Sequence, residues 1–246
     1  MNNTGQLEGV MVLVPAYNEA ATVGEVVRKA RETSDDYNVF VVDDGSNDGT
    51  SRLARESGAK VITLPFHCGG RWAMILGYRI AILNRYKYLV KVDADGQHKV
   101  SDINRLLANL AQGADVVVGS RYLPSEDNGE VSDSQIKHWG RILSSAMIST
   151  VVGMKVTDVT SGLRAWRCGV LKDLLDTYEK HGYAEDSVFW LNETILLRKL
   201  GKTILEVPVS ISLRMHGTSK SFTRLKMLNY PVRVFTTLLR SLFWGG

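Results

Sequence analysis

The fold of this chain is decided by the stretch VVDDGSNDGT, residues 41–50. An apolar run ends there in two consecutive acids, Asp43 and Asp44, and a turn of glycines and small polar residues follows. Asp48 is well placed to cap the helix that the next residues predict. Because the turn needs only one of the two acids, the pair favours a functional carboxylate at the end of a buried strand.

The same order of strand, turn and helix recurs on both sides of this stretch. The predicted strands are 10–14, 38–43, 60–64, 86–93 and 114–119, and the predicted helices are 19–32, 49–57, 72–83 and 101–111. Ser101 is the expected N-cap of the last helix. Apolar strands separated by helices predict an α/β fold, in which helices cover both faces of a mostly parallel sheet. Such a sheet binds ligands beyond the carboxyl ends of its strands.

The second half of the chain is less regular. Residues 123–135 are acidic and lack periodicity, so we expect a mobile loop there. The remaining predictions are a helix over 134–152, a turn or short strand over 157–167, a helix over 187–201 that Gly201 closes, and a last strand over 202–211.

The composition excludes several classes of protein. The chain has 246 residues, 44% hydrophobic and 23% charged, as expected for a globular protein with a substantial core. Its net charge of +4 suits an anionic ligand or membrane surface and is too small to indicate nucleic acid binding. The first residues do not resemble a secretory signal, and no uncharged apolar run reaches the roughly 20 residues of a spanning helix. Cys68 and Cys168 lack metal-ligand spacing and favour a reducing compartment, so we expect a cytoplasmic protein, peripheral on the cytoplasmic face of a membrane.

The stretch VKVDADGQH, residues 90–98, predicts a metal site. In an extended segment residues two apart point the same way, so Asp93 and Asp95 can converge on one cation. Their carboxylates and the amide oxygen of Gln97 suit Mg²⁺ or Mn²⁺, with His98 as an optional ligand. Such a metal would lie on the phosphates of a bound nucleotide. The alternative is an Asx-turn at the surface, because isolated D-x-D patterns are common.

Two further motifs are ambiguous by themselves. VPAYNEAATV, residues 14–23, is either a ligand-binding loop or a strand-to-helix turn whose acid complements the helix dipole. In RMHGTSK, residues 214–220, Arg214 and Lys220 could clamp a pyrophosphate around the flexible Gly217, or could belong to a solvated basic loop. The sequence motifs of other enzyme classes are missing. No G-x-G-x-x-G follows the first strand, which argues against a dinucleotide-dependent dehydrogenase, and neither G-x-S-x-G nor H-E-x-x-H occurs.

Together these motifs resemble glycosyltransferase family 2, the inverting transferases of GT-A fold, and within it the dolichol- or polyprenyl-phosphate mannosyl- and glucosyltransferase branch. The resemblance covers nearly the whole chain and rests on VPAYNEAATV, VDDGSNDGT, GYRIA, DADGQH, GSRY, TSGLRAWR, EVPV and RMHGTSK in that order. It implies a GT-A domain at 1–222 that holds the nucleoside of a GDP- or UDP-sugar through Pro15, Tyr17, Glu19, Val42 and Asp44. It also implies that Asp93, Ala94, Asp95 and Gln97 bind metal and diphosphate, and that Arg121, Arg214 and Lys220 embrace the phosphates of donor and acceptor.

The sequence departs from the family pattern in two places. Where the family has an Asn and a glycine-rich stretch, this chain has HCGGRWA, so that Arg71 and Trp72 are bulky at positions that are normally small. These residues point to an unusual sugar or acceptor specificity. The family also carries a glutamate in the helix before EVPV, and an ungapped match places Asn192 there, with Glu193 next to it. The sequence leaves that role open.

The C-terminal segment, which we assign to 223–246, predicts an amphipathic helix. Lys226, Arg233 and Arg240 are spaced by seven residues and so lie near one helical face, with apolar residues over much of the rest. Two readings stay open. The helix lies in a membrane interface, or it packs on the domain with its basic side chains reaching into solvent.

We therefore expect a metal-dependent transferase that moves a hexose from a nucleotide sugar to a polyprenyl phosphate at a membrane surface. The alternatives are transfer to a hydroxyl of a saccharide or another polymer, and a catalytically silent nucleotide-sugar-binding protein. A hydroxyl acceptor needs a base, whereas a phosphate needs only cations. The resemblance implies that Glu185 and Asp186 stand where hydroxyl-using members of the family carry that base, and the alternative is that both acids only complement the dipole of the helix they begin. The candidate catalytic residues are Asp95, Arg214, Lys220 and, for a hydroxyl acceptor, Asp186.

Overall fold

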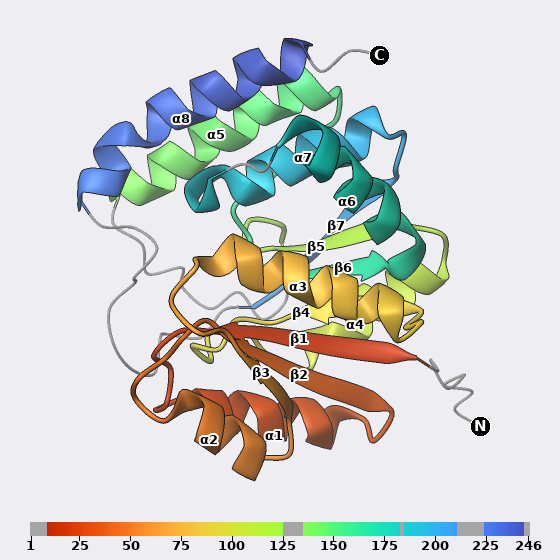
Figure 1. Cartoon of the computed structure of the whole chain (residues 1–246). Helices are drawn as coiled ribbons and strands as arrows, with labels where there is room; N and C mark the ends of the chain where they lie inside the picture. The colour runs from red at the N-terminus through yellow and green to blue at the C-terminus, as the bar shows by residue number, and fades with distance from the viewer. Residues whose placement is uncertain (1–8, 125–134, 183–184, 211–223, 244–246) are drawn as a thin grey trace.

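The computed structural model describes residues 9–124, 135–182, 185–210 and 224–243 of the chain (Figure 1). The strands are β1 (Val10–Ala16), β2 (Tyr37–Asp43), β3 (Lys60–Thr63), β4 (Tyr88–Lys91), β5 (Val116–Ser120), β6 (Arg164–Arg167) and β7 (Ile204–Pro208). The helices are α1 (Val23–Thr33), α2 (Thr50–Glu56), α3 (Gly70–Leu83), α4 (Asp102–Ala111), α5 (Gln135–Val152), α6 (Cys168–His181), the 3₁₀ turn η1 (Asp186–Val188), α7 (Phe189–Lys199) and α8 (Arg224–Phe243).

The strands form one sheet in the order β3-β2-β1-β4-β6-β5-β7. Every strand except β6 runs in the same direction, because β6 pairs antiparallel with both β4 and β5. The predicted α/β fold with a mostly parallel sheet is therefore confirmed. The carboxyl ends of β1, β2, β3 and β4 meet at one edge, where the predicted acids follow β2 and β4.

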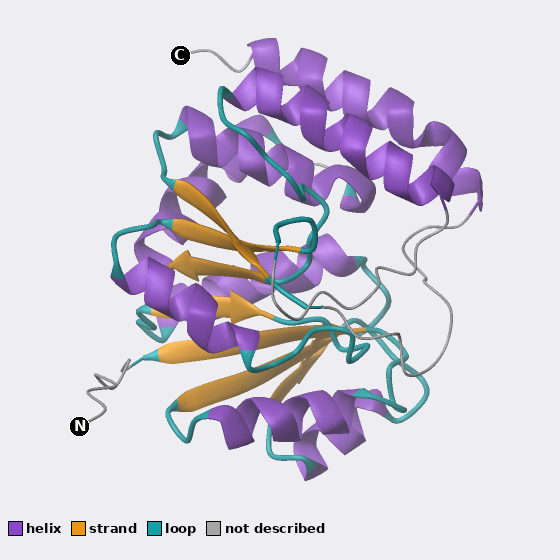
Figure 2. Cartoon of the chain, turned by 180° about the vertical axis from the view of Figure 1, so that it is seen from behind, coloured by secondary structure: helices purple, strands orange, loops and turns teal. Residues whose placement is uncertain are grey.

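Helices cover both faces of the sheet, and alternate residues of each strand supply the two cores. On β1, Val12 faces a core made with α1, α2 and α4, whereas Leu13 faces a core made with α3, α6 and α7. Figure 2 shows the two layers of helices on either side of the strands. Gly77 of α3 lies against Leu13, because a Cβ there would meet its side chain at 2.1 Å. The GYRIA motif thus serves close packing of helix on strand.

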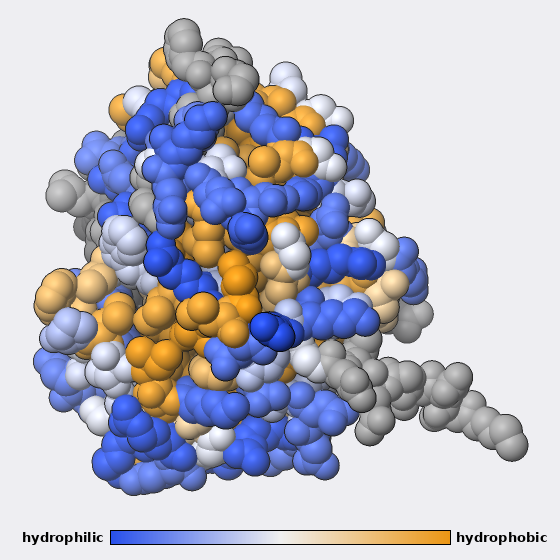
Figure 3. Space-filling view, turned by 45° about the vertical axis from the view of Figure 1, so that its right-hand side comes forward, coloured by the Kyte–Doolittle hydropathy of each residue, from blue (hydrophilic) through white to orange (hydrophobic). Residues whose placement is uncertain are grey.

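A third apolar cluster joins α5, η1, α7 and α8 beyond the sheet. Figures 1 and 2 both show α5 and α8 side by side, and in Figure 3 apolar atoms lie among polar ones over this upper part of the molecule. Val234 of α8 is buried in this cluster. Arg233 also points toward the domain, because it pairs with Glu185 and donates to Ser187 at 3.1 Å. The C-terminal helix therefore packs on the domain, while Phe235 on its other side is 56% exposed.

Several expectations differ from the structure in detail. Helix α6 was not predicted, and the N-cap of α2 is Gly49 instead of Asp48, although Asp48 Oδ1 still accepts the N–H of Thr50 at 3.1 Å. Ser101 does occupy the N-cap of α4, but its side chain makes no capping hydrogen bond. Most of the loop expected at 123–135 and the boundary expected at residue 222 fall outside the described residues. Of the helices described, none is long and apolar enough to cross a membrane.

Candidate active site

Two loops at the carboxyl edge of the sheet are tied together by hydrogen bonds. The N–H of Asn18 donates to Ser46 Oγ at 2.8 Å, and the N–H of Asn47 donates to Asn18 Oδ1 at 3.0 Å. The N–H of Glu19 donates to Thr50 Oγ1 at 2.9 Å. Asn18 has a φ of 52°, a left-handed conformation that Asn tolerates better than most residues. The motifs VPAYNEAATV and VDDGSNDGT therefore form one continuous surface.

The two consecutive acids make different contacts. Asp43 supports the turn, since its Oδ1 accepts the N–H of Ser46 at 3.1 Å and its Oδ2 accepts a hydroxyl from the first turn of α2. Asp44 faces the next loop and is 2% exposed. Its Oδ1 accepts the N–H of Cys68 at 2.7 Å, and its Oδ2 accepts the N–H of Gly69 at 2.8 Å. Asp44 is thus the member of the pair that reaches beyond its own turn and holds the loop before α3.

His67 completes the surroundings of Asp44, and the sequence did not single it out. Its Nδ1 lies 2.8 Å from Asp44 Oδ2 and carries the proton of this contact, because a carboxylate only accepts. The imidazole stacks on the Tyr17 ring, with centroids 3.8 Å apart and planes 20° apart. Pro15 and Val42 lie side by side on β1 and β2, just before these residues. The structure therefore brings the predicted nucleoside-contacting residues to one place.

Asp93 is held by the side chains of Lys91 and His98. Its Oδ1 contacts Lys91 Nζ, and its Oδ2 lies 2.9 Å from His98 Nε2. Burial alone would raise the pKa of Asp93, but the charges of Lys91 and His98 lower it below the ordinary value of a carboxyl. Lys91 is itself buried and lies over the Trp190 ring at 5.4 Å. A Cβ on Gly162 would meet Asp93 Oδ2 at 2.3 Å, so the TSGLRAWR motif packs directly on this carboxylate.

Asp95 is buried, and its Oδ1 accepts the N–H of Gln97 at 3.1 Å, the hydrogen bond of an Asx-turn. Ala94 between the two acids is also buried. Among the described residues, no three or more His, Cys, Asp or Glu side chains form a group that could hold a metal. The oxygens of Asp93, Asp95 and Gln97 do suit Mg²⁺ or Mn²⁺ in chemistry, and substrate phosphates commonly supply the other ligands.

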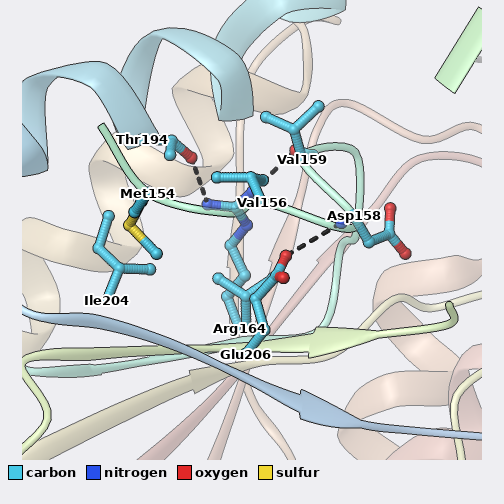
Figure 4. Close-up of a pocket in the computed structure, with 9 residues that line it drawn as sticks. Met154, Val156, Asp158, Val159, Arg164, Thr194, Ile204 and Glu206 are labelled. Atoms are coloured by element: carbon cyan, nitrogen blue, oxygen red, sulfur yellow. Dashed lines mark hydrogen bonds between the residues drawn. The ribbon is translucent and has the colours of Figure 1, made fainter. Parts of the chain in front are cut away.

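Arg121, predicted to contact phosphate, is fixed by Asp158. Its Nε lies 2.5 Å from Asp158 Oδ2, and Nη2 lies 2.6 Å from Oδ1 and 2.8 Å from Thr160 Oγ1. Burial lowers the pKa of Arg121, but the hydrogen bonds and charge of Asp158, with a smaller contribution from Asp93, raise it overall. The guanidinium is therefore a permanent positive charge close to Asp93. Asp158 is oriented by Glu206, whose Oε1 accepts its N–H at 3.0 Å (Figure 4).

The pocket behind this ion pair is filled by Arg164. Its guanidinium donates to the carbonyls of Val159 at 2.8 Å and Ser161 at 3.1 Å, and points toward Thr194 (Figure 4). Apolar side chains such as Met154 line the rest of the pocket. Burial lowers the pKa of Arg164, against the opposing charges around it. We read this pocket as the support that fixes the loop carrying Asp158.

The glutamate left open by the sequence is Glu193, which is fully buried. It accepts from the Tyr78 hydroxyl at 2.5 Å and from Trp166 Nε1 at 3.2 Å, and Arg164 lies 3.9 Å away. Asn192 is equally buried, and neither atom of its amide has a hydrogen-bond partner among the described residues. Glu193 thus joins α3, β6 and α7 within the core.

Asp186 and Glu185 both make contacts that hold the fold. Asp186 Oδ1 accepts the N–H of Arg71 at 2.9 Å in the first turn of α3, and a Cβ on Gly69 would meet Asp186 Oδ2 at 2.3 Å. Glu185 pairs with Arg233 of α8. Asp186 thus supports the first turn of α3, and Glu185 ties α8 to the domain.

Two of the predicted cations, Arg214 and Lys220, lie outside the described residues. Their contact with phosphate stays a prediction. The other predicted residues lie on the strand ends and loops described above, except Asp186, which begins η1.

A GT-A glycosyltransferase is the class that this sheet and its acidic strand ends define. The sequence profile described as "Glycosyl transferase family 2" matches residues 11–175, more than half of the chain. The chain belongs to this family, which confirms the resemblance seen in the motifs.

Two relatives match most of the chain. An undecaprenyl-phosphate mannosyltransferase of Micrococcus luteus is 33% identical, over 86% of this chain and 86% of that protein. A polyprenol monophosphomannose synthase of Mycolicibacterium smegmatis is 31% identical, over 85% of this chain and 80% of that protein. Among solved structures, glucosyl-3-phosphoglycerate synthase of Mycobacterium tuberculosis, in complex with Mn²⁺, UDP-glucose and phosphoglyceric acid, superposes with a TM-score of 0.71. It is 21% identical and covers 97% of this chain and 81% of its own, and this likeness shows the fold.

Proposed function

We propose that this chain is a metal-dependent inverting glycosyltransferase that moves a hexose from a nucleotide sugar of the GDP-mannose or UDP-glucose type to a polyprenyl phosphate. The observation that carries the proposal is the placement of Asp44, Asp93 and Asp95 after two strands of one sheet edge in a family 2 chain. The names of the two relatives, which act on undecaprenyl phosphate and a polyprenol, support the acceptor.

The donor nucleoside would bind over the joined loops of β1 and β2. Tyr17 offers a ring on which a base can stack, and Asp44 offers a carboxylate that accepts from an N–H on the base edge. Pro15, Glu19 and Val42 complete the wall. The position of Asp44 below the loop 67–69 supports this assignment, because base recognition needs a buried and fixed acceptor.

The diphosphate would lie toward β4. Asp93, Asp95 and Gln97 would hold a Mg²⁺ or Mn²⁺ ion there, and the ion would offset negative charge on the leaving diphosphate. Arg121 would add a positive charge. Its two contacts with Asp158 hold the guanidinium in a fixed position. Lys91 and His98 would keep Asp93 ionised and oriented.

The contacts of Glu185 and Asp186, the two acids that could serve as a base, bear on the identity of the acceptor. A hydroxyl must lose its proton as it attacks the anomeric carbon, whereas a phosphate monoester is already anionic near neutral pH. Asp186 is engaged by the N–H of Arg71, and Glu185 is engaged by Arg233. These contacts favour the phosphate, with Arg214 and Lys220 as the expected cations around it.

A membrane location fits such a lipid acceptor. The face of α8 that would contact the membrane is not the one that its basic residues suggest. Arg233 turns toward the domain, so the basic spacing of seven does not mark the outer face. The exposed apolar residues Val232, Phe235 and Leu239 lie three and four positions apart and therefore share one face. We propose that this face lies in the membrane interface on the cytoplasmic side.

The test combines donor binding with turnover. A thermal-shift panel of GDP- and UDP-sugars, with and without Mn²⁺, should show stabilisation of the full chain that depends on the metal. Asp95→Asn keeps the shape of the side chain but removes its charge, so the metal-dependent part should vanish and turnover should fall about a hundredfold or more. Asp36→Asn, an exposed acid at the opposite end of β2, is the matched control and should behave as wild type. Wild-type turnover of Asp95→Asn in Mn²⁺ would show that the metal assignment is wrong.

A further inference from the structure

The loop before α3 covers the proposed base site with a side chain of its own. The His67 ring lies flat on Tyr17 at 3.8 Å, and its Nδ1 donates to Asp44 at 2.8 Å. One planar, nitrogen-containing ring therefore makes both contacts that the proposed function assigns to a nucleobase, the stack and the hydrogen bond to the carboxylate.

The carboxylate of Asp44 has little capacity left in this arrangement. Two carboxylate oxygens offer about four acceptor positions, and His67, Cys68 and Gly69 use three of them. The remaining acceptor position of Asp44 could accept one N–H from a base edge, but not two neighbouring N–H groups. Departure of the imidazole returns one position to Asp44 and uncovers a face of Tyr17.

The backbone of this loop is closely fitted, so the side chain is the part that can move. A Cβ on Gly45 would meet the carbonyl carbon of Phe66 at 2.5 Å and the nitrogen of His67 at 2.8 Å. The His67 side chain, in contrast, is about half exposed, at 50%. Rotation of the imidazole into solvent therefore requires no rearrangement of the buried core.

We infer that His67 occupies the place of the nucleobase in the free protein, and that the base of a nucleoside diphosphate must displace its imidazole to bind. The inference rests on the proposed function and adds a specificity-determining residue to its donor site. Because displacement frees a second acceptor position, a guanine edge, with two N–H donors, depends on it more than a uracil edge, with one.

The experiment is calorimetric titration of the full chain with UDP, with GDP and with inorganic pyrophosphate, each at the same Mn²⁺ concentration. His67→Ala should bind UDP about tenfold more tightly than wild type, since one ring stack and one hydrogen bond no longer have to be broken, and should gain more for GDP. Pyrophosphate has no base, so its affinity should not change. His181→Ala, in the last turn of α6, is the control variant. In the wild-type protein, nucleotide should also move the NMR signals of the His67 ring away from the shielding of Tyr17.

The outcomes separate the inference from the proposed function. Equal or weaker nucleotide binding by His67→Ala, with wild-type binding intact, overturns the inference and leaves the donor site standing. An equal gain for pyrophosphate also overturns it, because the effect would then not concern the base. Absence of nucleotide binding by both proteins removes the proposed function and the inference together. In the wild-type protein, unchanged NMR signals of the His67 ring on saturation with UDP would contradict displacement of the imidazole.

Discussion

Loss of a single hydroxyl should measure how strongly the buried Glu193 network holds the fold. Tyr78→Phe removes one donor to Glu193 and changes nothing else in shape. The two oxygens are 2.5 Å apart and fully buried, and Trp166, Arg164 and the more distant Tyr178 remain as the other partners of the carboxylate. The change therefore isolates one hydrogen bond between α3 and α7.

A buried hydrogen bond to a charged group contributes about 1.5–3 kcal/mol, so we expect the free energy of unfolding to fall by about 2 kcal/mol. For a chain of this size that corresponds to a melting temperature lower by roughly 4–8 °C. Burial raises the pKa of Glu193, against the opposing effect of Arg164 and of the hydrogen bond from Tyr78. A raised pKa means that stability is lost as the pH rises through it, and removal of Tyr78 raises it further. The cost of Tyr78→Phe should therefore grow as the pH rises through the raised pKa of Glu193, which lies above the ordinary glutamate value of 4.5.

The assay is urea unfolding of wild type and variant at several pH values, followed by circular dichroism. Tyr178→Phe is the matched control, because its hydroxyl lies 3.5 Å from the same oxygen, at the limit of hydrogen bonding. It should cost less than half as much as Tyr78→Phe. Equal costs for the two variants, or a cost for Tyr78→Phe that does not change with pH, would refute the reasoning.

Three further predictions concern other parts of the chain. Burial raises the pKa of Cys168 to about 12, so a thiol reagent at pH 8 should modify Cys68 alone in the native protein and both thiols after denaturation; native modification of both would contradict this. Phe235→Ser should weaken binding to anionic liposomes, with nucleotide affinity unchanged and Thr236→Ser as the control, and equal binding would remove the interfacial face of α8. Asp186→Asn, whose amide oxygen can still accept from α3, should keep most turnover with polyprenyl phosphate, and a collapse of turnover in a folded variant would indicate a hydroxyl acceptor and make Asp186 the base.

The sheet and the location of the site could be predicted from the sequence because both depend on local patterns. Apolar strands followed by turns place acids at strand ends, and parallel strands bring those ends to one edge. The local pattern alone could not distinguish Asp43 from Asp44, although the family resemblance pointed to Asp44, since the partners of the two acids come from different places. Asp43 turns back to its own loop, whereas Asp44 is satisfied by Cys68 and Gly69, more than 20 residues away. Long-range backbone donors leave no periodic signal in the chain.

The orientation of a helix about its own axis was also beyond the sequence. Neighbouring helical residues point in directions about 100° apart, so an ungapped alignment could not decide whether Asn192 or Glu193 meets Tyr78. The spacing of seven predicted that Arg233 and Arg240 share a face, but spacing cannot say where that face points. A partner decides it, and Glu185 attracts Arg233 to the domain side. Helix α6 escaped prediction although its apolar residues are helically spaced and buried.

The departure at Arg71 and Trp72 bears on whether the site is intact. Two carboxylates fix the backbone of this segment: Asp44 accepts N–H groups before α3, and Asp186 accepts the N–H of Arg71. The conformation that excludes side chains falls on Gly69, with a φ of 101°. Arg71 lies over the Trp72 ring at 5.3 Å, and Trp72 is 37% exposed, so these bulky groups lie beside the loop without replacing its glycine. Under the proposed function, bulky side chains beside an otherwise intact loop favour an altered sugar or acceptor specificity over a loss of catalysis.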